Sequence, residues 1–427
     1  MPLLHSTTQT RSPRTADRGG APDAPPDFEL GELSFHLLRS VDELPEGLWD
    51  ARMCDGHPVR SEAWFRALER SHPERETVYL LGTRAGEPVA LAFVSCEPFD
   101  LAPVAAPWAV RPVAGVRRLV PGFLRMNLAM TGTVETGDRH WWRDPERVSA
   151  AELAEALDRA IDTAFPRARV VVVRDFHPLD PGSRAFEEEL GRERYRRVEG
   201  WPAARITLRA GATQEQLFAA LKRRPQKGVR RALEVAEREG LTFEHAPLTA
   251  AGMDELYPLY REVHARATEL VVPIEPPDFF AEAARALGDD VQVTVARERG
   301  GRAVGFILTL FRTHYANPFL IGLDYDVSRR YELYRGLHWH TIGLALERGC
   351  HVIDLGVTGF VAKQNLGAGL LPMAMAVRLR PRLLQRLFGR FLPALLHMPY
   401  PERRDARRAG AAVLPEDDPC RSSSSTC

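Results

Sequence analysis

Lysine is nearly absent from this sequence of 427 residues, which holds three lysines among 57 basic residues. The arginine excess is typical of a GC-rich coding bias, under which a position that accepts any cation drifts to arginine. A position that keeps lysine can need a compact, rotatable ammonium instead of a planar guanidinium. The three lysines, Lys222, Lys227 and Lys363, are therefore the first candidates for function, with residual drift as the alternative for each one alone.

Cysteine is also scarce, and the five cysteines show no CxxC spacing and no pairing rhythm. This pattern argues against a zinc site and a disulfide framework, and it is typical of a reducing compartment. No apolar run is long enough to cross a bilayer, and residues 1–26 lack the apolar core of a signal peptide. We therefore expect a cytoplasmic protein with no bound metal and no tightly bound cofactor.

Net charge is absent as well, because 57 basic residues balance 57 acidic ones. The molecule as a whole is therefore not a polyanion binder, and any phosphate contact must come from a local patch. A hydrophobic content of 44% and a charged content of 27% are typical of a soluble globular protein. The length favours two domains.

Two segments of the chain follow the same plan. Residues 77–82 and 89–94 are strand-like and flank the turn residues 84–87, and residues 291–295 and 303–308 flank 298–301 in the same way. A further strand-like stretch, a helix and a short buried strand follow each hairpin. This repetition predicts two α/β domains.

The helices and last strands of the two copies can be placed from local signals. Ser149 and Glu152 form a capping box that begins the first helix, and residues 170–173 are a β-branched run typical of a strand covered on both faces. In the second copy, residues 334–345 have helical spacing, Gly349 ends the helix, and residues 352–355 form the strand.

A basic helical segment joins the copies. Thr213 and Gln216 form another capping box, Pro225 is expected to interrupt the helix, and Gly240 ends it. We predict a disordered N-terminus (1–29), a first domain (30–200), a bridging strand and basic helices (201–245), a second domain with a C-terminal amphipathic helix (246–400), and a disordered tail (401–427).

The order of these features resembles a known family. A hairpin–strand–helix–strand unit is the core of the GNAT acyltransferase fold. Two such units joined by a basic helix resemble the Fem-type aminoacyl transferases and their BioF2-like acetyltransferase relatives. The more specific match is the ending Gly349 to Gly356 followed by Lys363-Gln364-Asn365-Leu366-Gly367. The resemblance implies an α/β fold of two tandem GNAT-like mixed-sheet domains.

One departure from the GNAT pattern bears on the donor. GNAT enzymes that use acetyl-CoA carry a glycine-rich loop whose backbone N–H groups hold the pyrophosphate at a helix start. Residues 328–336 stand in its place here and are bulky. The resemblance therefore implies aminoacyl-tRNA as a slightly favoured donor, with acyl-CoA as the close alternative.

The resemblance also implies site residues. The lysine that corresponds to Lys363 lies at the acyl-transfer centre of Fem-type relatives, so Lys363 is the candidate oxyanion donor. Asp354 is a candidate to orient it or to act in the cleft. Asp324 and Asp326, around Tyr325, lie where a GNAT amine substrate arrives, and either aspartate is a candidate base. The alternatives are a surface lysine, a strand-end cap and a turn.

Two basic segments carry further predictions. Lys222, Arg224, Lys227 and Arg231 are expected to contact donor phosphates or a tRNA acceptor end, with a solvated helix face as the alternative. Residues 382–396 form a basic amphipathic stretch suited to docking on the second domain or to weak membrane-surface contact, which liposome flotation would detect.

The sequence thus predicts an N-acyltransferase that joins an acyl or aminoacyl group to a small or cell-envelope amine. A catalytically silent module that binds a glycan, a lipid-linked precursor or RNA in the groove between the domains is the alternative from another class.

Overall fold

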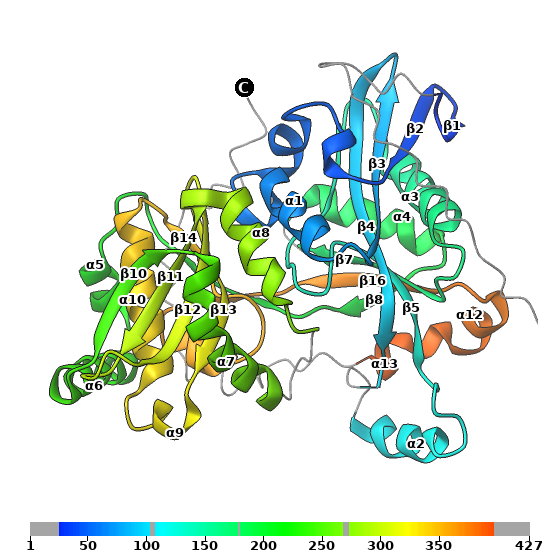
Figure 1. Ribbon diagram of the computed structural model, residues 1–427. Coiled ribbons are helices and arrows are strands. Elements are labelled where there is room, and N and C mark those ends of the chain that lie inside the picture. Colours follow the sequence, from blue (N-terminus) through cyan, green and yellow to red (C-terminus); the bar gives the residue numbers. More distant parts are fainter. Residues whose placement is uncertain (1–24, 103–106, 178–179, 268–272, 397–427) are drawn as a thin grey trace, which may run out of the picture.

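The computed structural model describes residues 25–102, 107–177, 180–267 and 273–396. These residues form two mixed β-sheets with helices around them (Figure 1). The first sheet has the strands β1 (Phe28–Leu30), β2 (Leu33–Leu38), β3 (Glu76–Arg84), β4 (Glu87–Asp100), β5 (Arg125–Thr131), β6 (Trp141–Arg143), β7 (Val170–Phe176), β8 (Arg196–Glu199) and β16 (Ala374–Leu379). The second has β9 (Ala203–Thr207), β10 (Thr242–Pro247), β11 (Val291–Arg297), β12 (Ala303–Arg312), β13 (Tyr315–Leu323), β14 (Val352–Asp354) and β15 (Gly369–Leu371).

Helices connect and cover the strands. They are α1 (Glu62–Ser71), α2 (Pro107–Arg117), α3 (Ala150–Ala164), α4 (Pro181–Arg192), α5 (Gln214–Ala220), α6 (Arg223–Glu239), α7 (Ala250–Arg266), α8 (Pro277–Leu287), α9 (Tyr325–Ser328), α10 (Leu333–Glu347), α11 (Phe360–Gln364), α12 (Arg382–Phe388) and α13 (Leu392–Leu395). Short helical turns include η2 (Asp50–Cys54) and η3 (Pro58–Arg60). Within the described ranges, none of the helices has the length and apolar character that a bilayer crossing requires. Residues 1–24 and 401–427 of the predicted disordered ends lie outside the described residues. Phe28 and Glu29, within the predicted disordered N-terminus (1–29), instead lie in β1 and pair with β2.

The repeated plan is confirmed at the level of pairing. The hairpins are β3–β4 and β11–β12, and each is followed by an antiparallel third strand, β5 or β13. That third strand pairs in parallel with the strand after the helix, β7 or β14. The Ser149 and Thr213 capping boxes form as predicted. Pro225 does not interrupt a helix: the break lies at Leu221 and Lys222, and Pro225 takes the third position of α6, where a backbone N–H would lack an intrahelical partner.

The two units exchange a strand. β9 follows the first unit in sequence but lies in the second sheet, between β14 and β15. β16 follows the second unit but lies in the first sheet, between β7 and β8, where Figure 1 shows it in orange. The structure therefore places these strands across the predicted domain ranges. In each sheet the strand next to the β8 or β15 edge comes from outside that unit.

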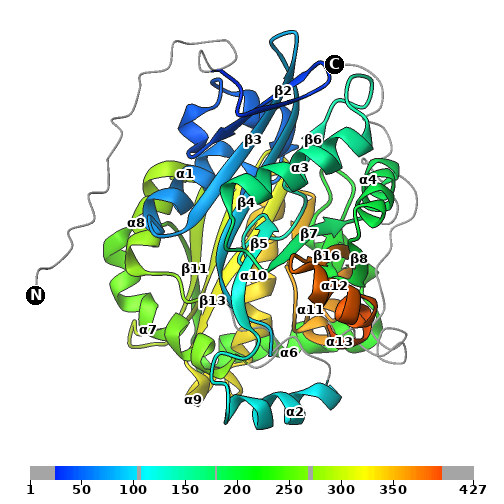
Figure 2. The ribbon, with the colours of Figure 1, turned by 90° about the vertical axis from the view of Figure 1, so that its right-hand side faces the viewer.

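A shared core fixes the two units against each other. Trp64 on α1 makes edge contacts with Phe279 on α8 and Phe319 on β13, with ring centroids 5.7 and 4.9 Å apart. Figure 2 shows α1 and α8 side by side between the two sheets. The three side chains bury large apolar areas, and aromatic pairs of this geometry add about 0.5–1.5 kcal/mol each. The space between the units is therefore bounded by rigid walls.

The C-terminal segment docks, but on the first unit. Leu392 is buried with Leu128 and Val377 of the first sheet. Gln385 donates to the Arg194 carbonyl at 2.6 Å and accepts from the Leu379 N–H at 2.9 Å. The predicted docking partner, the second domain, was wrong because β16 carries this segment across to the first sheet. Membrane contact stays a prediction, and Leu383 and Leu387 are exposed on the outer side.

Candidate active site

A cavity of about 650 Å³ lies between the two units. Its walls come from the ends of β5 and β7 in the first sheet, of β13 and β14 in the second, and from α7, α10 and α11. A volume in this range is typical of small-molecule sites. Most of the lining is apolar, and the polar groups gather where the strands part.

The strands part at the same place in both units. β13 and β14 pair only through Tyr315 and Ala316, after which the Asn317 side chain donates to the Asp354 carbonyl at 2.8 Å. β5 and β7 pair up to Met130, after which the Thr131 hydroxyl accepts from the Arg174 N–H at 3.1 Å. In each unit a side chain thus bridges the backbones of the two strands where they diverge. Residues at these diverging strand ends, Arg174 in the first unit and Asn317 in the second, line the cavity.

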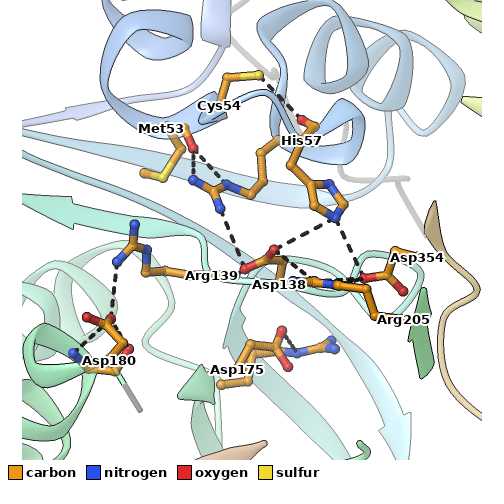
Figure 3. A network of polar contacts seen from close by, with 12 residues as sticks. Met53, Cys54, His57, Asp138, Arg139, Asp175, Asp180, Arg205 and Asp354 are labelled. Carbon is orange, nitrogen blue, oxygen red and sulfur yellow. Dashed lines mark hydrogen bonds and ion pairs between the residues drawn. The ribbon is translucent and has the colours of Figure 1, made fainter. Parts of the chain in front are cut away.

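Two aspartates and one arginine form the centre of the polar wall (Figure 3). Arg205, on the exchanged strand β9, donates to Asp354 Oδ2 from Nη2 at 2.8 Å and lies 3.6 Å from Asp138 Oδ2. Asp354 Oδ1 accepts from the Gly356 N–H at 2.8 Å, so this residue also caps the turn after β14. The exchanged strand thus supplies the cation that holds carboxylates from both units.

Two residues from the first unit complete this network. His57 Nε2 lies 3.7 Å from Asp138 Oδ2 and 3.9 Å from Asp354 Oδ2. Arg60 Nη1 lies 3.6 Å from Asp138 Oδ1, and its Nε donates to the Met53 carbonyl at 2.7 Å. The Met53 carbonyl on η2 therefore orients the Arg60 guanidinium that faces Asp138.

The pKa values of the paired aspartates are held low. Burial raises the pKa of Asp138, but the charges of Arg60, His57 and Arg205 outweigh it, and the net pKa lies well below the ordinary value. For Asp354, burial is likewise outweighed by Arg205 and His57, and the pKa is lowered. Both carboxylates stay ionised at neutral pH, so neither is suited to accept a proton from a substrate.

Asp175 differs from its neighbours. It lies near the end of β7, lines the cavity, and contacts the Arg174 guanidinium at 2.8 Å. Burial is the largest influence and raises the pKa of Asp175 to about 6, although Arg174 opposes this and Asp138 and Asp354 add to it. A carboxylate with a pKa near the working pH is suited to general base catalysis.

Backbone strain gathers at the same wall. Asp138, Asp175 and Thr358 have φ values of 81°, 65° and 65°, in the left-handed region that favours glycine. All three line the cavity. Such conformations cost about 1–3 kcal/mol each and cluster at functional sites. The surrounding fold therefore gives up stability to place these side chains.

Lys363, the predicted oxyanion donor, lines the cavity from α11 and is 7% exposed. Its ammonium donates to the Val357 carbonyl at 2.6 Å. The nearby His338 is buried, and burial together with the Lys363 charge lowers the His338 pKa to about 4, against a raising hydrogen bond to the Tyr334 carbonyl. Because the His338 imidazole is neutral, the Lys363 ammonium provides the positive charge beside it in the wall.

Of the predicted catalytic residues, Asp324 and Asp326 lie outside the cavity. The Asp324 carboxylate caps α9 through the Asp326 N–H and pairs with Arg302 at 2.7 Å. Neither aspartate is among the cavity-lining residues, which favours the turn interpretation. Tyr325 lines the cavity at its edge, with the Arg266 guanidinium 4.4 Å from its ring.

The predicted phosphate-contacting residues are exposed on α6. Lys222, Arg224, Lys227 and Arg231 all face solvent there, and α6 packs against α10. Arg231 lies 3.2 Å from Glu332. The four residues do not line the cavity. Of the four, Arg231 reaches the start of α10, whose next turns carry the cavity residues Tyr334 and His338.

A carboxylate occupies the start of α10. Glu332 is the N-cap, and it pairs with Arg335 at 2.6 Å as well as with Arg231. Its carboxylate makes no capping hydrogen bond, and these two arginines balance its charge. The bulky side chains of residues 328–336 are therefore the feature that disfavours close approach of a pyrophosphate to this helix start.

Sequence reasoning missed Asp138, Asp175, His57 and Arg205. Asp175 follows a β-branched run and is a polar residue at the end of a buried strand, which is a usable signal. Arg205 has no such signal, because its role depends on the strand exchange. Among the described residues, no group of three or more side chains of the metal-binding types converges. The expectation of no bound metal stays a prediction.

Comparisons with known proteins agree with this architecture. Residues 222–364 match a family model described as an acetyltransferase (GNAT) domain. No curated protein matches the chain. The crystal structure of FemX aligns with a TM-score of 0.51 at 12% identity, covering 76% of this chain and 92% of that one.

Two further solved structures align at lower scores. A tandem GNAT protein from the clavulanic acid biosynthesis pathway, determined without AcCoA, gives a TM-score of 0.47 at 14% identity, covering 82% of this chain and 98% of that one. The C-terminal domain (DUF2156) of a putative lysylphosphatidylglycerol synthetase from Agrobacterium fabrum gives 0.42 at 13% identity, covering 73% and 87%. The FemX alignment and the family match confirm the predicted fold of two GNAT-like units.

Proposed function

We propose that this protein, an acyltransferase with two GNAT-like units of the Fem type, forms an amide between an activated acyl or aminoacyl donor and an amine acceptor in the cavity between its units. The observation that carries the proposal is that a buried ammonium, Lys363, and a carboxylate with a raised pKa, Asp175, line the same cavity. Acyl transfer to an amine needs both kinds of group.

Each group has a defined role in this reaction. The Asp175 carboxylate takes a proton from the acceptor ammonium, and the free amine attacks the acyl carbonyl. Lys363 donates to the oxygen that becomes negative as the tetrahedral intermediate forms. The intermediate then collapses to the amide as the C–O ester bond of aminoacyl-tRNA, or the C–S bond of acyl-CoA, breaks, and the leaving oxygen or sulfur takes the second proton of the attacking nitrogen. One well-placed donor of this kind is worth about 3–4 kcal/mol. Holding the two reactants in one cavity supplies roughly 7–11 kcal/mol in the best intramolecular cases.

Aminoacyl-tRNA is the favoured donor. The bulky side chains of residues 328–336 at the start of α10 disfavour the pyrophosphate of CoA, and the exposed cations of α6 suit the phosphates of a tRNA acceptor end. The acceptor is a small or cell-envelope amine. Acyl-CoA remains the second candidate donor, because the family match is to an acetyltransferase domain.

A transfer assay separates the two donors. Purified protein is incubated with a panel of amines and either labelled aminoacyl-tRNA or labelled acyl-CoA. Transfer from charged tRNA alone supports the proposal, whereas transfer from acyl-CoA alone overturns the tRNA version. If neither donor is used, the alternative of a binding module for a glycan, a lipid-linked precursor or RNA gains support.

Salt dependence tests the role of α6 directly. If Lys222 and Lys227 neutralise phosphates, replacing each with alanine should weaken tRNA binding. The slope of log affinity against log salt should then fall by about 0.7–0.9 for each phosphate that is no longer neutralised. Arg192→Ala, at an exposed position on α4, is the matched control and should leave the slope unchanged. An unaltered slope in the lysine variants would assign α6 to a solvated face.

The pH dependence tests Asp175. The wild-type kcat/KM should rise as pH increases through about 6, because the base must be ionised. Asp175→Asn should lower kcat/KM at pH 8 by roughly 10²–10⁴-fold and abolish this limb, so that the two proteins converge in acid. Rates measured from pH 5 to 9 check this. A limb that persists in the variant would point to another base.

A further inference from the structure

A second group of charges lies in the wall of the cavity, apart from the network around Arg205. Glu275, in the segment before α8, is 2% exposed, and Glu135, after β5, has a side chain that is 3% exposed. Both line the cavity. Glu97 on β4 lies behind them with 13% of its side chain exposed. We call these three residues the acidic cluster.

The acidic cluster has too little positive charge for its size. Arg75 Nη2 lies 2.7 Å from Glu135 Oε1 and 3.9 Å from Glu97 Oε2. His72 Nε2 lies 3.3 Å from Glu275 Oε2, but burial and the Arg75 charge lower the His72 pKa, so the imidazole is neutral at pH 7. One arginine therefore faces three carboxyl groups.

Several buried oxygens of the cluster have no hydrogen bond within the described part of the chain. They are both carboxyl oxygens of Glu275, Glu135 Oε2 and Glu97 Oε1, and the Arg75 Nη1 guanidinium nitrogen has no hydrogen bond either. A buried acceptor without a donor is destabilising. Glu275 and Glu135 also line the cavity, so a cation with several N–H donors that enters there would satisfy their oxygens.

The raised pKa values in the acidic cluster show that its carboxyl groups have too little positive charge around them. Burial raises the pKa of Glu275 well above its usual range, and Glu135 and Glu97 raise it further against the opposing charge of Arg75. Burial also raises the pKa of Glu97 to about 7, with Glu135 and Glu74 adding to it and Arg75 opposing. The Tyr260 hydroxyl, which accepts from the Glu275 N–H at 3.2 Å, is the remaining titratable neighbour.

We propose that the acidic cluster binds an ammonium group of the acceptor, so that the acceptor is a dibasic amine with one cation held at Glu135 and Glu275 while its other amine reacts beside Asp175 and Lys363. The inference rests on the proposed function. An organic ammonium suits the cluster better than a metal ion, because it brings several N–H donors to acceptors that come from three separate segments.

The test compares α,ω-diamines of three to six carbons with monoamines of the same length, as acceptors and as ligands in thermal unfolding. A charge-assisted hydrogen bond is worth about 1.5–3 kcal/mol, so we expect the best diamine to exceed its monoamine by about 10–100-fold in kcat/KM. The advantage should grow as pH rises through about 7, because the Glu97 carboxyl group, whose pKa burial raises to about 7, then adds its negative charge to the cluster. Equal use of both amines would overturn the inference.

Substitutions in the acidic cluster test whether it causes the diamine advantage. Glu275→Gln and Glu135→Gln should each remove the diamine advantage, whereas Glu188→Gln, at an exposed position on α4, should keep it. If one cluster variant fails to fold, the other and the wild-type comparison still decide. A diamine that stabilises the wild type but not the cluster variants, with no transfer to any amine, would support the cluster and overturn the proposed function. A diamine advantage that survives in the cluster variants would overturn the inference.

Discussion

Replacing Lys363 with methionine should lower kcat by about 10²–10³-fold, which corresponds to about 3–4 kcal/mol of transition-state stabilisation. Methionine keeps the length and apolar stem of the side chain, so the packing around this 7% exposed position is preserved. The ammonium contributes mainly when the carbonyl oxygen becomes negative, so KM should change much less than kcat. Steady-state kinetics with saturating donor measure both.

The fold of this variant must be checked, because the ammonium also donates to the Val357 carbonyl. Thermal unfolding should therefore be compared with that of Lys227→Met, an exposed lysine on α6. A Lys363→Met protein that unfolds like the control but keeps wild-type kcat would exclude Lys363 from the mechanism. A fall in kcat together with a large drop in stability would call for Lys363→Arg, which keeps the charge.

Replacing Arg205 with leucine should destabilise the protein by about 3–5 kcal/mol, because it leaves the buried carboxylates of Asp138 and Asp354 without their shared cation. This destabilisation should depend on pH. Both aspartates have pKa values lowered in the folded state, so their stabilisation is present above about pH 4 and disappears as pH falls. The variant should therefore approach wild-type stability in acid.

Chemical denaturation from pH 3 to 8 measures this difference. Arg192→Leu is the matched control, because that guanidinium is 74% exposed and pairs with Glu189 at the surface; its effect should stay within about 0.5 kcal/mol. A second variant, Arg205→Leu with Asp354→Asn, should recover part of the stability. Equal destabilisation at every pH would mean that Arg205 acts through packing and not through charge.

Local signals predicted much of this fold. The two hairpins, both capping boxes and the helix and strand that follow each hairpin depend on residues close in sequence, or on apolar runs that leave few choices. The positions of β9 and β16 could not be predicted, because each pairs with strands far along the chain and no local signal identifies its partner. The repeated plan predicted two α/β units, and the resemblance added their GNAT-like character.

The site was predicted less completely. Lys363 was found because lysine is rare here and because of the motif around it. The Asp324–Asp326 segment fits a turn and a substrate site equally well as a sequence, and the structure separates the two by the contact with Arg302 and by the position of both aspartates outside the cavity. Asp175 was missed although its place at the end of a β-branched run is a usable signal, because its desolvation and its backbone conformation cannot be read from residue types.

The strand exchange has a consequence for biosynthesis. When the first 200 residues have left the ribosome, one edge of β7 is still unpaired, because β16, its neighbour on that side, arrives with residues 374–379. An unprotected strand edge is prone to pairing with other chains. The nascent protein must therefore keep this edge shielded through most of translation, and a fragment ending near residue 372 should sediment as aggregates where the whole chain stays monodisperse.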